Sequence, residues 1–173
     1  QEQIRRIAPA QEIQFLVVLR NQLDLLRSQR VEEVNLERYR GAQFLVEQED
    51  GLLDLRGFEV YEFGSYVENL VHLVGRKFVK VHFFENLVAS PHLFYESLAA
   101  DFGVRADDLP DHVLSVRENI SKLQQDSDDP LTNRLSSFTP EQENQISAHF
   151  LSTNQKLVGL FQNEECLKNW GYL

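Results

Sequence analysis

An apolar run that stops abruptly at an arginine places the strongest limit on how this chain folds. The run covers residues 15–19, FLVVL, and ends at Arg20. A short apolar run bounded by polar residues is typical of a parallel strand that is buried on both faces. A helix-like spacing of leucine and valine follows, from about Leu23 to Val34. We therefore expect a strand at Ile13–Leu19 that leads into a helix.

The end of this strand is a candidate anion site. In open α/β sheets, ligands bind just outside the carboxyl ends of the strands, where the next helix begins. The planar guanidinium of Arg20 can hold a phosphate at two points, and Ser28 on the helix can add a hydroxyl. The helix amino terminus contributes free N–H groups. The structural alternative is that Arg20 pairs with Asp24 one helical turn on, with Ser28 in solvent.

A similar pattern recurs later in the chain. An amphipathic helix is predicted at Phe63–Val74, with Ser65 as its N-cap and Gly75 at its end. A second strand is predicted at Phe78–Phe84, which is nearly all apolar. The core-facing helix predicted after it buries Leu93, Phe94, Leu98 and Phe102.

The last long helix has a clear start signal. Residues 139–142, TPEQ, form a capping box with proline at the first helical position, and Ile146, Phe150, Leu157 and Phe161 form the predicted buried face. Strand, helix, strand and helix in turn predict an α/β layer fold with a mainly parallel sheet. The length suits a single domain over residues 1–173. Only two strands are evident, fewer than in a sheet of normal size.

Several stretches, in order along the chain, resemble the sulfotransferases that use 3′-phosphoadenosine 5′-phosphosulfate (PAPS). Residues 20–28, Arg-Asn-x-x-Asp-x-x-x-Ser after a hydrophobic strand, look like the family's 3′-phosphate-binding motif. Lys80–Phe102 is similar to its strand, Glu-x-Leu and long-helix segment, and Val116–Lys122 resembles the stretch that follows. The tail through Trp170-Gly171-Tyr172 is similar to the ending of bacterial members.

This resemblance implies a P-loop-type sulfotransferase fold, incomplete at its N-terminus. The implied reaction moves a sulfuryl group from PAPS to a hydroxyl or amine and leaves adenosine 3′,5′-bisphosphate, without a metal. Arg20 and Ser28 would hold the 3′-phosphate, although Gln22 stands where the motif usually has proline. Further nucleotide contacts are implied for three residues, for which a loop-ending turn with the lysine in solvent is the equal alternative: Asn119, Ser121 and Lys122.

The beginning of the chain affects the functional prediction. It starts at Gln1 and contains no methionine, which indicates a carboxy-terminal portion or a processed product. In the family, the phosphosulfate-binding loop comes after the first strand, upstream of the motif seen here, and we expect that loop and the catalytic base before Gln1. We therefore assign no catalytic residue and expect residues 1–173 alone to be inactive. The alternative function is a non-catalytic sulfotransferase-like domain that acts in binding or assembly.

Composition narrows the partners. The net charge of −10 argues against general binding to nucleic acid or anionic membranes. No apolar run approaches the roughly 20 residues of a transmembrane helix, and a single cysteine, Cys166, is compatible with a reducing compartment. We expect a cytoplasmic enzyme with a small-molecule or glycan acceptor. The five histidines show no metal-type spacing, and neither the acceptor's identity nor an oligomeric state is predicted.

Three other residues are interpreted as structural. His82 alternates with apolar neighbours in the second strand, so we predict a packed, hydrogen-bonded side chain. Glu85 follows that strand, and capping of the next segment or pairing with a basic residue such as Arg20 or Lys122 is favoured over a role in the cleft. Trp170 is expected to pack the end of the chain onto the domain.

Overall fold

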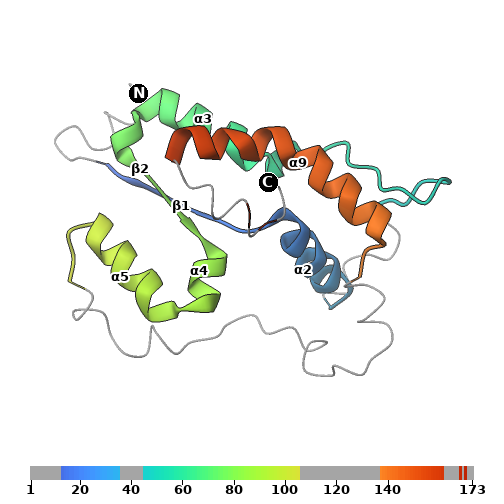
Figure 1. The fold of residues 1–173 in the computed structure, drawn as a ribbon, viewed down its shortest axis with the longest axis horizontal. Helices are drawn as coiled ribbons and strands as arrows, with labels where there is room; N and C mark the ends of the chain where they lie inside the picture. The colour runs from blue at the N-terminus through green and yellow to red at the C-terminus, as the bar shows by residue number, and fades with distance from the viewer. Residues whose placement is uncertain (1–12, 36–44, 106–136, 162–167, 169, 171–173) are drawn as a thin grey trace.

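The computed structural model describes residues 13–35, 45–105, 137–161, 168 and 170 of the 173-residue chain. These residues form a small α/β structure in which helices lie on both sides of two strands (Figure 1). The elements, in chain order, are β1 (Phe15–Leu19), α2 (Gln22–Asn35), the short 3₁₀ helix η1 (Glu59–Tyr61), α3 (Phe63–Val74), the 3₁₀ helix η2 (Arg76–Phe78), β2 (Val79–Phe83), α4 (Phe84–Ala89), α5 (Pro91–Asp101) and α9 (Pro140–Phe161).

The two strands pair in parallel, as the sequence predicts. Phe15 lies opposite Val79 and Leu19 opposite Phe83, so both strands end at the same edge. Helix α2 begins three residues after β1 ends, and α4 begins directly after β2. The carboxyl edge of the sheet therefore brings together Arg20 and the first turns of two helices.

The main core lies between the sheet and the pair of helices α3 and α9. Phe150 and Ile146 of α9, Val67 of α3 and Val79 of β2 are all fully buried there. The two helices approach closely because Gly64 has no side chain: a Cβ added at this position would lie 1.6 Å from the carbonyl oxygen of Thr153. The backbone N–H of Ser65 donates to the Thr153 hydroxyl at 2.9 Å and joins the helices at the same point.

The predicted capping box at the start of α9 is confirmed. The Thr139 N–H donates to Gln142 Oε1 at 3.1 Å, and the Gln142 N–H donates to Thr139 Oγ1 at 3.2 Å. Two backbone N–H donors at the start of the helix are thereby satisfied within four residues, which is why this start is readable from sequence. The predicted bounds of α3 are also confirmed, and Gly75 ends it with a φ of 100°.

Two details of the predicted helices are wrong. Ser65 is not an N-cap, because α3 begins two residues earlier, after Glu62. In α5, Phe94 and Ala99 are buried, whereas Leu93 and Phe102 are largely exposed. The apolar spacing predicts a wider buried face on α5 than the part of this helix that β2 covers. None of the helices in the described ranges is both long and apolar enough to cross a membrane.

Candidate functional site

Arg20 lies at the carboxyl end of β1, where the sequence places the anion site. Its side chain is partly buried, and the guanidinium carbon lies 5.0 Å from the centre of the Phe84 ring. Among the described residues it forms no hydrogen bond or ion pair. The predicted alternative partner, Asp24, instead pairs with Arg27 at 2.9 Å. An arginine held by an aromatic face keeps its N–H groups available for an anion.

Asn21 caps helix α2 and ties its start to two other parts of the chain. Its Oδ1 accepts from the Asp24 N–H at 3.2 Å, the geometry of an N-cap. Its Nδ2 donates to the carbonyl oxygen of Trp170 at 3.2 Å, and its backbone N–H donates to Glu85 Oε1 at 2.7 Å. These three contacts of Asn21 hold the backbone directly after Arg20 in place.

Glu85 is a structural carboxylate at this edge of the sheet. It accepts from the start of α2, not from the segment that follows it, and it forms no ion pair with Arg20. The interpretation that Glu85 has a structural role agrees with this contact, although its partner is a backbone group. Its second oxygen, Oε2, is buried and has no hydrogen-bond partner in the described part of the chain. A negative charge at a helix N-terminus is favourable, and it occupies a donor that a bound anion would otherwise use.

Ser28 lies in the middle of α2, and its side chain is partly buried. Ser28 lies six positions after Gln22, which corresponds to roughly 9 Å along the helix axis. Its hydroxyl makes no hydrogen bond to the described residues, and no contact joins it to Arg20. The other three predicted nucleotide contacts, Asn119, Ser121 and Lys122, fall outside the described residues.

Gln22 and Asn154 form a buried pair that the sequence did not reveal. Both side chains are fully buried. Gln22 Nε2 donates to Asn154 Oδ1 at 2.8 Å, and Asn154 Nδ2 donates to Gln22 Oε1 at 3.0 Å. Gln22 also donates to the carbonyl oxygen of Tyr61 at 3.2 Å. The residue that stands in place of the motif's proline thus locks the start of α2 to α9, a role that proline lacks the donor to fill.

A second polar group lies on the face of the sheet that is turned away from α3 and α9. His82 Nε2 is 2.8 Å from Asp101 Oδ2, and Lys80 Nζ donates to Asp101 Oδ1 at 3.0 Å. Burial raises the pKa of Asp101, but the hydrogen bonds from Lys80 and His82 outweigh it, so that the pKa lies below its ordinary value. The predicted packed, hydrogen-bonded role of His82 is confirmed, whereas its two partners were not predicted.

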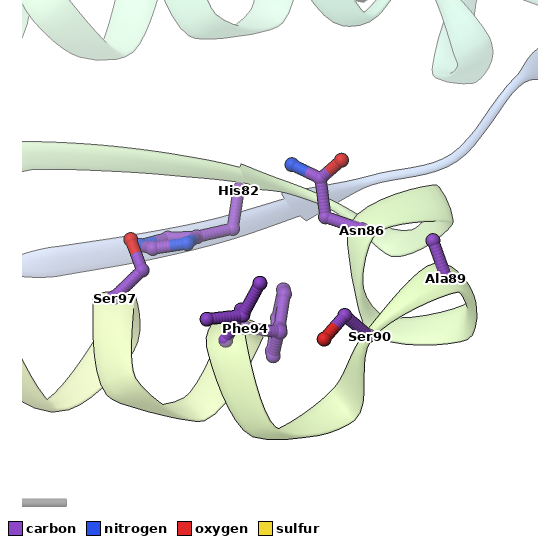
Figure 2. A pocket seen from close by; sticks show the side chains of 7 residues that line it. His82, Asn86, Ala89, Ser90, Phe94 and Ser97 are labelled. Carbon is purple, nitrogen blue, oxygen red and sulfur yellow. The ribbon is translucent and has the colours of Figure 1, made fainter.

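His82 also lines a cavity of about 300 Å³ between β2 and the helices α4 and α5 (Figure 2). The cavity lining contains His82, Asn86, Ala89, Ser90, Leu93, Phe94 and Ser97. Arg20 and Ser28 do not line it, so the two candidate sites are separate. Within the described ranges, no three His, Cys, Asp or Glu side chains are grouped so that they could hold a metal ion.

Trp170 packs the end of the chain onto the domain, as expected. It is buried and its ring meets that of Phe83 edge-on, with centres 5.3 Å apart.

Comparison of the chain with protein-family models, with curated proteins and with solved structures found no match.

Proposed function

We propose that this chain is a PAPS-binding sulfotransferase domain, whose reaction is the transfer of the sulfuryl group to a hydroxyl or amine, and that residues 1–173 alone bind the nucleotide without turnover. The observation that carries the proposal is the position of Arg20. Its guanidinium lies at the carboxyl end of a parallel strand, immediately before the helix that contains Ser28. This is the position that ligand phosphates favour in open α/β sheets.

The lack of an acidic partner among the described residues makes Arg20 informative. The chain has 27 acidic and 17 basic residues, so an arginine has more carboxylates than cations to choose from. The nearby Arg27 does pair with Asp24 and Glu143. Arg20 instead lies over Phe84 and forms no ion pair with a described residue. A partly buried cation in this state gains most from an anionic ligand.

Glu85 limits where the phosphate can lie. Because its carboxylate already accepts the Asn21 N–H, a phosphate cannot use that donor and must be held by side chains. Arg20 and Ser28 supply a bidentate cation and a hydroxyl for this purpose. The residues present therefore fit a 3′-phosphate bound through side chains, beside a negative charge that weakens the binding.

The role of these residues is to bind and position the nucleotide. PAPS supplies the activated sulfuryl group when it is bound. Arg20 holds and orients the nucleotide by its 3′-phosphate, and Ser28 adds a donor that a ligand without this phosphate cannot use. Positioning of this kind lowers the barrier by reducing the entropy lost on the way to the transition state. No described residue is assigned as the catalytic base.

Titration calorimetry with adenosine 3′,5′-bisphosphate tests the proposal. Replacing Arg20 by alanine should weaken binding about 10- to 100-fold, the effect of losing one charge-assisted hydrogen-bonding partner worth about 1.5–3 kcal/mol. Arg56→Ala is the matched control, because Arg56 is an exposed arginine whose partner is the neighbouring Asp54. Equal dissociation constants for the wild type and Arg20→Ala would overturn the assignment.

Two further variants examine the same subsite. Ser28→Ala should reduce the preference for the 3′,5′-bisphosphate over adenosine 5′-monophosphate, whereas equal losses for both ligands would mean that Ser28 supports only the helix. Glu85→Gln should tighten bisphosphate binding by about threefold to tenfold, because it removes a nearby negative charge. A transfer assay with labelled PAPS checks the expectation that residues 1–173 alone are inactive: clear turnover would show that the catalytic base lies within these residues.

A further inference from the structure

The cavity beside His82 has a mixed lining that is drawn from three elements. Apolar surface comes from Ala89, Leu93 and Phe94, while His82, Asn86, Ser90 and Ser97 provide polar atoms. Figure 2 shows the His82 ring extending from β2 toward Ser97 of α5. A concave apolar surface with a few converging polar groups is the usual form of a small-molecule site, and about 300 Å³ is at the small end of such sites.

The network around Asp101 determines which nitrogen of His82 carries the proton. Asp101 is ionised at neutral pH, because hydrogen bonds from Lys80 and His82 outweigh the effect of burial and hold its pKa below the ordinary value. An ionised carboxylate only accepts hydrogen bonds, so Nε2 of His82 is the donor in the 2.8 Å contact. In the neutral ring, Nδ1 is then an acceptor.

This acceptor is unused. The His82 side chain is only 8% exposed, but its Nδ1 is not one of the fully buried, unpartnered atoms of the described residues, so water can reach it. Nδ1 has no hydrogen-bond partner among the described residues, and neither do the side chains of Asn86, Ser90 and Ser97. An acceptor that only water satisfies can exchange that water for the O–H or N–H donor of a ligand.

The lining of the cavity favours a neutral ligand. Apart from His82, no ionisable side chain lines it. Lys80 and Asp101 lie nearby, but they are paired with each other, so neither is available to a charged group. Phe94 already meets the His82 ring edge-on at 5.4 Å, which shows that flat rings pack well at this position.

We propose that this cavity binds a small, neutral aromatic alcohol. Its ring packs against Phe94 and Leu93, and its hydroxyl donates to Nδ1 of His82. Asp101 acts as a positioning residue, since it fixes the tautomer and orientation of the imidazole through Nε2. The proposal is independent of the nucleotide subsite, because Arg20 and Ser28 lie outside the cavity.

The test compares two probes of similar shape, phenol and toluene, by ligand-observed NMR titration. Phenol should bind about five- to tenfold more tightly, because only phenol can donate to Nδ1. In His82→Phe, which keeps a ring but lacks the nitrogen, the two affinities should become equal. Equal affinities in the wild type, or an unchanged phenol preference in His82→Phe, would overturn the proposal.

Two alanine positions on neighbouring helices provide a matched steric test. Ala89 lines the cavity and Ala100 does not, and both are exposed. Ala89→Phe should abolish phenol binding by filling the cavity, whereas Ala100→Phe should leave it unchanged. Phenol binding that survives in Ala89→Phe would place the ligand elsewhere and overturn the proposal.

A measurement on the unaltered protein covers the case in which a variant does not fold. With ¹⁵N-labelled histidine, the Nδ1 resonance of His82 should shift on addition of phenol, and the other histidines should not change. The same amount of toluene should leave the Nδ1 resonance in place. Saturating phenol without a shift at His82 would exclude the proposed hydrogen bond.

Discussion

The two faces of the β1–β2 sheet differ sharply in how they are covered. On the face toward α3 and α9, Val79 is fully buried and Phe83 is only 4% exposed. On the other face, Leu16 and Val18 are 42% and 46% exposed, while His82, opposite Val18 in the register, is 8% exposed beneath α5. The second face is therefore covered over β2 and open over β1 within the described residues.

This difference separates the two kinds of chemistry in the molecule. The closed face contains interlocked apolar side chains and buried amides, which hold the helices at fixed distances. The open face contains the ionic network of Lys80, His82 and Asp101 and the adjoining cavity. A parallel sheet is normally buried on both faces. Here only one face is fully covered within the described residues. We therefore expect the closed face to carry most of the stability and the open face to tolerate substitutions.

The closest helix contact should give the largest effect. Gly64→Ala places a methyl group where the backbone oxygen of Thr153 stands, and backbone cannot move aside cheaply. We expect the free energy of unfolding in urea to fall by about 3 kcal/mol. Gly159→Ala is the control, since Gly159 has nothing within 4 Å and alanine favours a helix by up to about 1 kcal/mol. A similar change in both variants would mean that α3 and α9 do not meet as closely as described.

The buried amide pair should give the next largest effect. Asn154→Ala leaves Gln22 without its two hydrogen bonds to Asn154 in a fully buried position, which should cost about 2 kcal/mol of unfolding free energy. The exposed neighbour Gln155 offers the control, where alanine should change stability by less than about 0.5 kcal/mol. Equal values in urea unfolding would show that the amide pair does not hold α2 to α9.

The same substitution on opposite faces compares the faces directly. Val79→Thr buries a hydroxyl without a partner and should cost about 1–2 kcal/mol. Val18→Thr places that hydroxyl on the open face and should change the free energy of unfolding by less than about 0.5 kcal/mol. If Val18→Thr cost as much as Val79→Thr, the face that bears Leu16 and Val18 would be covered in solution.

The smallest effect concerns the pH dependence of the open face. Hydrogen bonds from Lys80 and His82 place the pKa of Asp101 below its ordinary value of 3.8. A lowered carboxyl pKa stabilises the fold above the unfolded value, and this contribution is lost as the pH falls through the folded value. The thermal midpoint of the wild type should therefore exceed that of Asp101→Asn at pH 7, and the difference should shrink below pH 3.8. A constant difference down to about pH 2 would exclude this linkage.

Much of the candidate phosphate site was readable from sequence, because its parts are local. A short apolar run, a terminal arginine and a helical serine place Arg20 at the end of a strand and Ser28 on the helix that follows. Their roles in binding remain predictions. The partners that surround them were not readable: Phe84 contacts Arg20, and Glu85 accepts from the neighbouring Asn21, only because β1 and β2 pair in parallel.

The sequence by itself determined the elements whose signals lie within a few residues. The α3 helix at Phe63–Val74, the capping box before α9 and the two apolar strands follow from periodicity and capping, which depend on neighbours in the chain. Only the tertiary structure decided which polar residues pair in the interior. Gln22 and Asn154 are 132 positions apart and His82 and Asp101 are 19 apart. A buried hydrogen bond requires two groups to meet in space, and no local pattern records which distant residue will satisfy a given donor.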